Sequence, residues 1–239
     1  MRLKLYKLYH IIECAFISCT RIFQKTNPPF VSRSTKVICI VLFVLLIDQS
    51  SKIWVKLMME YGDEFNIFGL DWARIHFVEN NGMAFGISLG GKTGKLLLSL
   101  FRFIAVCFLG YYIRQLIREK ANFMITASFA LILAGALGNI IDSAVYGLIF
   151  SESNYHGGFA EIFPEDGGYS SFLHGKVVDM LYFPMYDGYF PEWFPFWGGQ
   201  SLQFFRPVFN VADMSITIGV FTIILFLFGF FNKDGKEGW

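Results

Sequence analysis

Carboxylate and amide side chains recur at helical spacing within apolar stretches of this 239-residue chain. Three pairs stand three or four residues apart, which places both members of each pair on one face of a helix. An ionisable group costs roughly 2.5–3.5 kcal/mol at the centre of a membrane span, so its presence there indicates a function by default. The pairs are Asp48 with Lys52, Asn139 with Asp142, and Asn210 with Asp213.

A further carboxylate, Asp179, lies in the apolar run 176–183 of an otherwise polar loop. An acid among such neighbours is expected near a lipid surface. At about 1.5 Å per helical residue, Asp48, Asp142 and Asp213 fall toward one end of the helices that would carry them. Carboxylates from segments far apart in the chain are therefore predicted at a similar depth.

Two carboxylates held close together in a low-dielectric site cannot both ionise cheaply, so one keeps a proton and the other does not. Such a pair can deprotonate a water, direct it at a peptide carbonyl and protonate the leaving amine. The chain has no Gly-x-Ser-x-Gly, His-Glu-x-x-His or Ser/Lys arrangement, and its four histidines are too scattered to predict a zinc site. If the chain is an enzyme, its residues favour carboxylate chemistry.

Each of these residues also has a simpler explanation. Asp48 and Lys52 can form an ion pair within one helix, and Asn139 and Asn210 can hold helices together by hydrogen bonds. Buried carboxylates on several helices also describe a proton- or cation-coupled membrane transporter. A non-catalytic membrane subunit that binds a partner is the third alternative. The chain shows no internal repeat, so we rank the enzyme first, the transporter second and the subunit third.

The composition indicates that a membrane-spanning scaffold positions these residues. Hydrophobic types make up 54% of the chain and charged types 16%, against about 25% charge in soluble domains. The net charge of +1 gives no reason to expect a nucleic-acid partner. Four stretches approach or exceed the roughly 20 apolar residues that a span needs: about 37–59, 96–117, 123–141 with an extension toward 150, and 208–231.

Charge asymmetry predicts the orientation of these spans. Seven Lys and Arg residues and one acid precede the first span, and the connection between the second and third spans is also basic. The outer loops, about 60–95 and 150–206, carry five acids against three bases and seven acids against two. The positive-inside rule therefore predicts that both termini are cytoplasmic. We expect a cytoplasmic N-terminal extension at 1–33, a four-helix transmembrane domain at 34–232, and a cytoplasmic tail at 233–239.

The outer loops carry two local signals. Residues 73–77 alternate between the two faces of a strand and run into Asn80-Asn81-Gly82, which predicts a strand entering a turn and a small sheet on the outer surface. The second loop is rich in aromatic residues that suit the lipid headgroup region. These are Phe190, Trp193, Phe194, Phe196 and Trp197.

Five segments, in order along the chain, resemble the lipoprotein signal peptidase (type II signal peptidase) family. The resemblance covers about 37–231 and is specific because each segment lies in the expected topological place. The segments are Asp48-Gln49-Ser50-Ser51-Lys52, Asn80-Asn81-Gly82-Met83-Ala84-Phe85-Gly86, Gly135-Ala136-Leu137-Gly138-Asn139-Ile140-Ile141-Asp142, Val177-Val178-Asp179, and Phe209-Asn210-Val211-Ala212-Asp213.

The resemblance implies roles that spacing does not show. It makes Asp179 and Asp213 the catalytic aspartates of an endopeptidase. It implies four transmembrane helices with a small extracytoplasmic antiparallel β-cradle and a short surface helix, an all-α membrane protein in class. The residues expected to shape the site or bind substrate are Asp48, Lys52, Asn80, Gly82, Asn139, Asp142 and Asn210.

The implied substrate is a prolipoprotein whose cysteine already carries diacylglycerol, cut immediately before that cysteine. Neither metal nor organic cofactor is expected. The implied location is the bacterial cytoplasmic (inner) membrane, with the site at the outer, periplasmic face. The partners expected are the substrate and membrane lipid, with the enzyme itself a monomer.

The chain departs from the family pattern in three places. Ser143 follows Asp142 where the family usually has Arg, and Met180 replaces the usual Phe after Asp179. The intervals on either side of Asp179 are longer than usual. We expect the inserted segments, about 150–175 and 186–205, to form a lid or an additional platform at the membrane surface.

Overall fold

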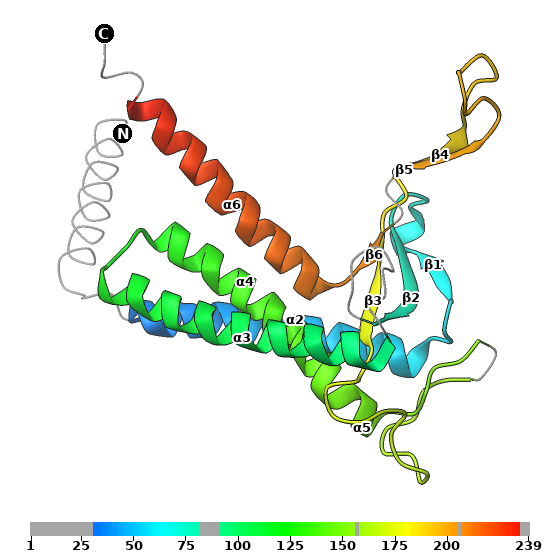
Figure 1. Ribbon diagram of the computed structural model, residues 1–239, viewed down its shortest axis with the longest axis horizontal. Helices are drawn as coiled ribbons and strands as arrows, with labels where there is room; N and C mark the ends of the chain where they lie inside the picture. Colours follow the sequence, from blue (N-terminus) through cyan, green and yellow to red (C-terminus); the bar gives the residue numbers. More distant parts are fainter. Residues whose placement is uncertain (1–30, 82–90, 156–157, 205–206, 235–239) are drawn as a thin grey trace, which may run out of the picture. The chain divides into compact units, whose positions relative to one another are not determined.

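The computed structural model describes residues 31–81, 91–155, 158–204 and 207–234. Four of its helices are long and apolar enough to cross a membrane (Figure 1). The predicted spans are thus confirmed. The helices are α2 (Arg33–Met58), α3 (Gly91–Arg118), α4 (Phe123–Ile141) and α6 (Val211–Asp234).

The third span extends beyond α4, as the sequence indicated. After Ile141 the chain continues through a π-helical turn, η3 (Asp142–Tyr146), and a last short turn, α5 (Gly147–Ile149). The candidate span is therefore Phe123–Ile149. Asp142 stands at the junction, where π-helical turns often mark functional sites.

The fourth span begins later than the predicted residue 208. Val208 and Phe209 form a strand, and the helix begins at Val211 because Asn210 caps it. The backbone N–H of Asp213 donates to Asn210 Oδ1 at 2.9 Å, and the backbone N–H of Asn210 donates to Asp213 Oδ2 at 3.3 Å. This reciprocal arrangement is a capping box, and it places Asp213 in the first helical turn.

A small antiparallel sheet lies beside the end of the bundle at which α6 begins (Figure 1). Its order is β1-β2-β3-β6, so β3 is paired on both sides. The predicted strand and sheet are confirmed. The strands are β1 (Glu64–Asn66), β2 (Arg74–Asn80), β3 (Val177–Tyr182) and β6 (Val208–Phe209).

The register of β2 on β3 changes along its length. Ile75 is opposite Leu181, whereas Val78 is opposite Asp179, so β2 has one more residue than β3 in this interval. Such a bulge re-aims the side chains that follow it. Asn80 is among those side chains, and it comes to lie opposite Val177.

The apolar core beneath the sheet joins it to the helices. It contains buried residues from α2, β2, the end of the third span and β3. Met180 belongs to this core and is almost fully buried, so the departure from Phe after Asp179 is accommodated by packing. The core comprises Val55, Met59, Phe77, Tyr146, Phe150, Val178 and Met180.

The two inserted segments have different structures. The first folds back on the third span, with the N–H of Phe163 donating to the Ile149 carbonyl at 2.7 Å and a bridge between Phe150 and Ile162. The second forms a hairpin of β4 (Tyr186–Tyr189) and β5 (Ser201–Phe204). Its tip stacks Phe190 on Phe194, with ring centroids 5.1 Å apart.

Three expectations remain predictions. In the described part of the first outer loop, the helical turn is the 3₁₀ segment η1 (Ile67–Gly69), so the short surface helix is not established. Residues 1–30 lie outside the described residues, and so the proposed extension and the domain boundary at 33 are also untested.

Candidate active site

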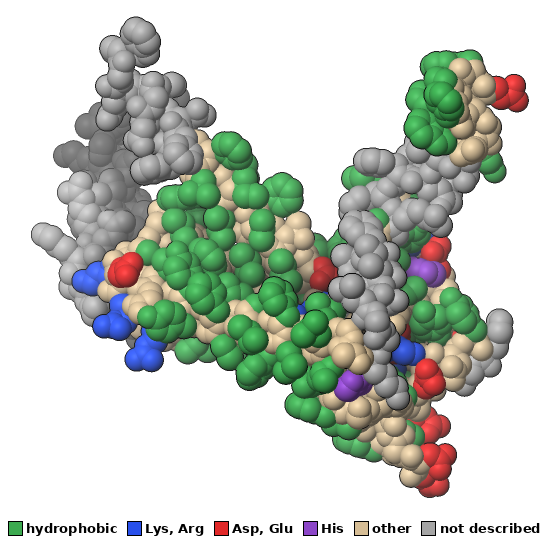
Figure 2. Space-filling view, in the orientation of Figure 1, with side chains coloured by type: hydrophobic (Ala, Val, Ile, Leu, Met, Phe, Trp, Pro, Cys, Tyr) green, Lys and Arg blue, Asp and Glu red, His purple; other side chains and the backbone are tan. Residues whose placement is uncertain are grey.

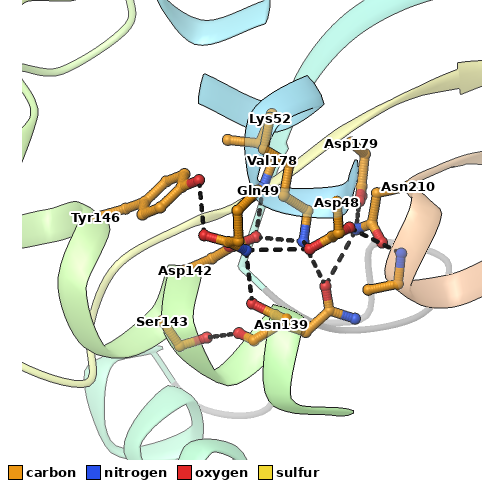
Figure 3. Close-up of polar contacts among 12 residues, drawn as sticks. Asp48, Gln49, Lys52, Asn139, Asp142, Ser143, Tyr146, Val178, Asp179 and Asn210 are labelled. Carbon is orange, nitrogen blue, oxygen red and sulfur yellow. Dashed lines mark hydrogen bonds and ion pairs between the residues drawn. The ribbon is translucent and has the colours of Figure 1, made fainter. Parts of the chain in front are cut away.

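A single buried ammonium group joins the first and third spans. Lys52 is fully buried, and its Nζ lies 2.9 Å from Asp48 Oδ2 and 2.8 Å from Asp142 Oδ2 (Figure 3). It also donates to Asn139 Oδ1 at 3.0 Å. The pair expected within one helix is therefore part of a group that spans two helices.

Gln49 strengthens the same junction. Its Nε2 donates to Asp48 Oδ2 at 3.0 Å and to Asp142 Oδ1 at 2.9 Å, while its Oε1 accepts a hydrogen bond from Tyr146 at 3.1 Å (Figure 3). Sequence reasoning assigned no role to either residue. Gln49 stands inside the Asp48–Lys52 motif, which was a usable signal, but nothing in the sequence singles out Tyr146.

Glycines of the third span permit close approach by its neighbours. A Cβ on Gly138 would lie 2.5 Å from Asp48 Oδ2, and a Cβ on Gly135 would lie 2.2 Å from the Ala212 carbonyl oxygen. Asp48 Oδ1 in turn accepts from the backbone N–H of Ala212 at 2.8 Å. The small residues at 135 and 138 therefore bring α2 and α6 against α4.

Asn210 binds both predicted catalytic carboxylates. Its Nδ2 donates to Asp179 Oδ1 at 2.7 Å, and its backbone N–H donates to Asp213 Oδ2 at 3.3 Å. Asp179 stands on β3 and Asp213 on the first turn of α6. One residue thus connects acids from two structural elements.

Two more amides complete the surroundings of the acids. Asn139 Nδ2 donates to Asp213 Oδ1 at 2.9 Å, and Asn139 Oδ1 accepts from Asn210 Nδ2 at 3.2 Å. Asn80 Nδ2 donates to Asp179 Oδ2 at 3.3 Å. Every oxygen of the two carboxylates therefore faces a donor, which fixes the orientation of both groups.

Burial, together with the nearby charge of Asp213, raises the pKa of Asp179 to about 7. Hydrogen bonds from Asn80 and Asn210 and the charge of Lys52 oppose this increase in pKa. A carboxyl group with such a pKa can both hold and release a proton near neutral pH.

The structure brings together all but one of the predicted site residues. Gly82 lies outside the described residues. Within the described residues, no group of three or more His, Cys, Asp or Glu side chains is arranged to hold a metal ion. The residues brought together are Asp48, Lys52, Asn80, Asn139, Asp142, Asp179, Asn210 and Asp213.

Ser143 is buried where the resemblance led us to expect Arg. Its hydroxyl donates to the Asn139 carbonyl at 3.0 Å, and its own carbonyl accepts from the N–H of Gly175 at 2.8 Å. The positive charge beside Asp142 comes from Lys52. The inserted segment thus passes close to position 143, and the cation for Asp142 comes from α2.

Comparisons with known proteins agree with this geometry. Residues 40–229 match the family described as Signal peptidase (SPase) II. The chain is 48% identical over 190 residues to the lipoprotein signal peptidase of Porphyromonas gingivalis, covering 79% of this chain and 81% of that protein. It is 36% identical over 189 residues to the lipoprotein signal peptidase of Amoebophilus asiaticus, covering 78% and 75%.

The fold also matches a solved structure. A bacterial membrane enzyme has a TM-score of 0.53 and 25% sequence identity to this chain. The match covers 85% of this chain and 92% of that one.

The close contact at Gly138 gives a stability prediction. Gly138→Ala would force a methyl group against the Asp48 carboxylate, and we expect it to lower the free energy of unfolding by about 1–3 kcal/mol. Gly110→Ala on α3 is the matched control, since a Cβ there meets nothing within 4 Å. Thermal unfolding in detergent measures both variants, and equal stabilities would contradict the role of the glycine.

Asp142 is expected to matter more for stability or substrate binding than for the chemical step. Asp142→Asn removes one of the two carboxylates that neutralise buried Lys52, which leaves its charge less well compensated. We expect a lower unfolding temperature or a higher KM, with a smaller change in turnover at saturating substrate. Lost turnover with unchanged stability and affinity would overturn this expectation.

Proposed function

Because the chain belongs to the signal peptidase II family of aspartic peptidases, membrane enzymes that process prolipoproteins, we propose that Asp179 and Asp213 are its catalytic pair. The observation that carries this assignment is Asn210, which donates to one acid through its side chain and to the other through its backbone. A transporter would not require two acids held by one shared residue at the end of the bundle.

The pair works with one proton between its two carboxyl groups. The ionised carboxylate takes a proton from a water, whose oxygen adds to the scissile carbonyl carbon, and the protonated carboxyl donates to the carbonyl oxygen. When the tetrahedral intermediate collapses, the carbon–nitrogen bond breaks and the leaving nitrogen takes up the proton that the first carboxylate removed from the water. The second carboxylate recovers its proton from a hydroxyl of the intermediate as the new carboxyl group forms. Burial favours Asp179 as the proton holder near neutral pH.

The remaining polar residues position the pair. Asn80, Asn139 and Asn210 orient the carboxylates through the hydrogen bonds described above. Asp48, Lys52 and Asp142 hold α2 against the third span and thereby fix Asn139. Gly82 is proposed to shape the substrate site on the grounds of motif resemblance alone.

The substrate is proposed to be a prolipoprotein with a diacylglyceryl-modified cysteine, cut immediately before that cysteine. A lipid-anchored residue is held at the membrane interface, and the acids stand where α6 begins beside the sheet. This location suits a scissile bond next to the lipid.

The site is proposed to face the periplasm, with both termini in the cytoplasm. Side chains of Lys and Arg gather at one end of the helices and most Asp and Glu side chains at the other end (Figure 2). The positive-inside rule assigns the basic end to the cytoplasm. The aromatic tip of the β4–β5 hairpin, with Trp193 and Phe196 79% and 92% exposed, suits the headgroup level. The enzyme is proposed to act as a monomer in contact with membrane lipid.

Asp179→Asn and Asp213→Asn should each abolish processing while the protein stays folded, because a single carboxyl group cannot serve as both acid and base. Purified variants in detergent are incubated with diacylglyceryl-modified and unmodified precursors, and cleavage is followed together with thermal unfolding. Asp166→Asn, at an exposed acid of the inserted segment, is the control and should cleave normally. Near-normal cleavage by either catalytic variant refutes the assignment, and equal cleavage of both precursors by the unmutated enzyme refutes the lipid requirement.

The pH profile should report the proton held by Asp179. Above about pH 7, where Asp179 ionises, kcat/KM should fall by about tenfold per pH unit. Asn80→Ala removes a hydrogen bond that stabilises the ionised form, so the pKa of Asp179 rises and the alkaline limb moves to higher pH. The charges of Asp213 and Lys52 are left in place in this variant.

The matched control is Asn66→Ala, since Asn66 stands on β1, which β2 separates from β3, and donates to Asp71 in the connection to β2. Its pH profile should coincide with that of the unmutated enzyme. An Asn80→Ala profile that stays in place or moves to lower pH would contradict the proposed contact with Asp179.

A further inference from the structure

A second buried ionic cluster lies one helical turn from Lys52. Lys56 of α2 is fully buried and forms an ion pair with Glu79 of β2, whose side chain is almost completely buried. Ser153 of the first inserted segment accepts from Lys56 Nζ at 2.8 Å and donates to Glu79 Oε1 at 3.2 Å. The mechanism proposed above uses none of these three residues.

The cluster also reaches the beginning of β3. Lys176 Nζ lies 3.6 Å from Glu79 Oε2 and 3.1 Å from Glu152 Oε1. Lys56 Nζ stands 5.1 Å from the ring centroid of Tyr169, and the Tyr169 hydroxyl accepts from the N–H of Lys176 at 2.6 Å. Glu79 is therefore bound to α2 on one side and to the residue that precedes β3 on the other.

The position of Glu79 in its strand connects this cluster to the active site. Successive strand residues point to opposite faces, so Glu79 faces Lys56 while its neighbour Asn80 faces Asp179. Both follow the bulge between Ile75 and Val78. Because a slip of one residue reverses which face a side chain occupies, the register after the bulge decides whether Asn80 reaches Asp179.

A buried ion pair is weak evidence for a stabilising role, because removing two charges from water offsets much of their attraction. Polar groups buried in this way are best attested where they select one register over another. Here Glu79 lies in the part of β2 whose register against β3 is shifted by the bulge. Its location matches a role in register better than a role in net stability.

We propose that Lys56 and Glu79 are positioning residues of this peptidase, which fix β2 beyond its bulge so that Asn80 engages Asp179. The first inserted segment supports them by enclosing the pair with Ser153 and Tyr169. This gives the insertion a task within the enzyme. The inference rests on the proposed catalytic role of Asp179.

The test compares Lys56→Met, Glu79→Gln and the double variant Lys56→Met/Glu79→Gln. Glu79→Gln leaves buried Lys56 without its ion-pair partner, and Lys56→Met leaves Glu79 with only the more distant Lys176. Each single variant should therefore unfold at a lower temperature, whereas the double variant removes both charges and should recover much of that loss. Its turnover should nevertheless stay about tenfold to a hundredfold low, since misplacing a catalytic group by about 1 Å has effects of this size. KM should change little, and the alkaline limb of the pH profile should move to higher pH, as in Asn80→Ala.

The matched control is Arg74→Met/Glu64→Gln, which removes a partly exposed ion pair between β2 and β1. It should retain both the turnover and the pH profile of the unmutated enzyme. The positioning role is wrong if the double variant Lys56→Met/Glu79→Gln also keeps the turnover and pH profile of the unmutated enzyme. It is also wrong if the control loses as much turnover as that double variant.

Ser153→Ala serves as a milder probe should the charge variants fail to fold. It retains both charges but removes the hydroxyl that bridges them, so a smaller loss of turnover with the same direction of pH shift is expected. An unchanged pH profile overturns the proposal. Activity in Asp179→Asn would instead overturn the catalytic assignment, whereas an inactive Asp179→Asn beside a fully active double variant would overturn the positioning role alone.

Discussion

One buried cation, which can only donate hydrogen bonds, determines the direction of the hydrogen bonds in the proposed active site. An ammonium group can donate but not accept, so Lys52 must face Asp48, Asp142 and the Oδ1 of Asn139. This orientation leaves Asn139 Nδ2 directed at Asp213. A charge on α2 thus sets which atom of an amide on α4 meets a carboxylate on α6.

The direction of the hydrogen bond to Asp179 is determined in the same way. Asn210 Oδ1 accepts the backbone N–H of Asp213 as part of the helix cap, so its Nδ2 is left to donate to Asn139 Oδ1 and Asp179 Oδ1. The cap that begins α6 therefore also orients the side chain between the two acids. The start of α6 and the orientation of the proposed catalytic acids therefore share one residue.

Sequence reasoning succeeded where the signal was local and failed where it depended on pairing across the fold. Helical spacing predicted Asp48, Asp142 and Asp213 at a similar depth, and alternation predicted β2. The start of α6 was predicted too early because β6 forms only by pairing with β3. Gln49, Tyr146 and the Lys56–Glu79 pair were missed, because each acquires its partner from a segment distant in the chain.

The inserted segments show why the site tolerates long additions on both sides of Asp179. β3 is held by β2 on one edge and β6 on the other, and the additions enter before its first residue and after its last. Loop-closure entropy grows only slowly with loop length, so the thermodynamic cost of the extra residues is small. What must be preserved is the register of β3 against β2, and the first insertion contributes Ser153 to the cluster that holds that register.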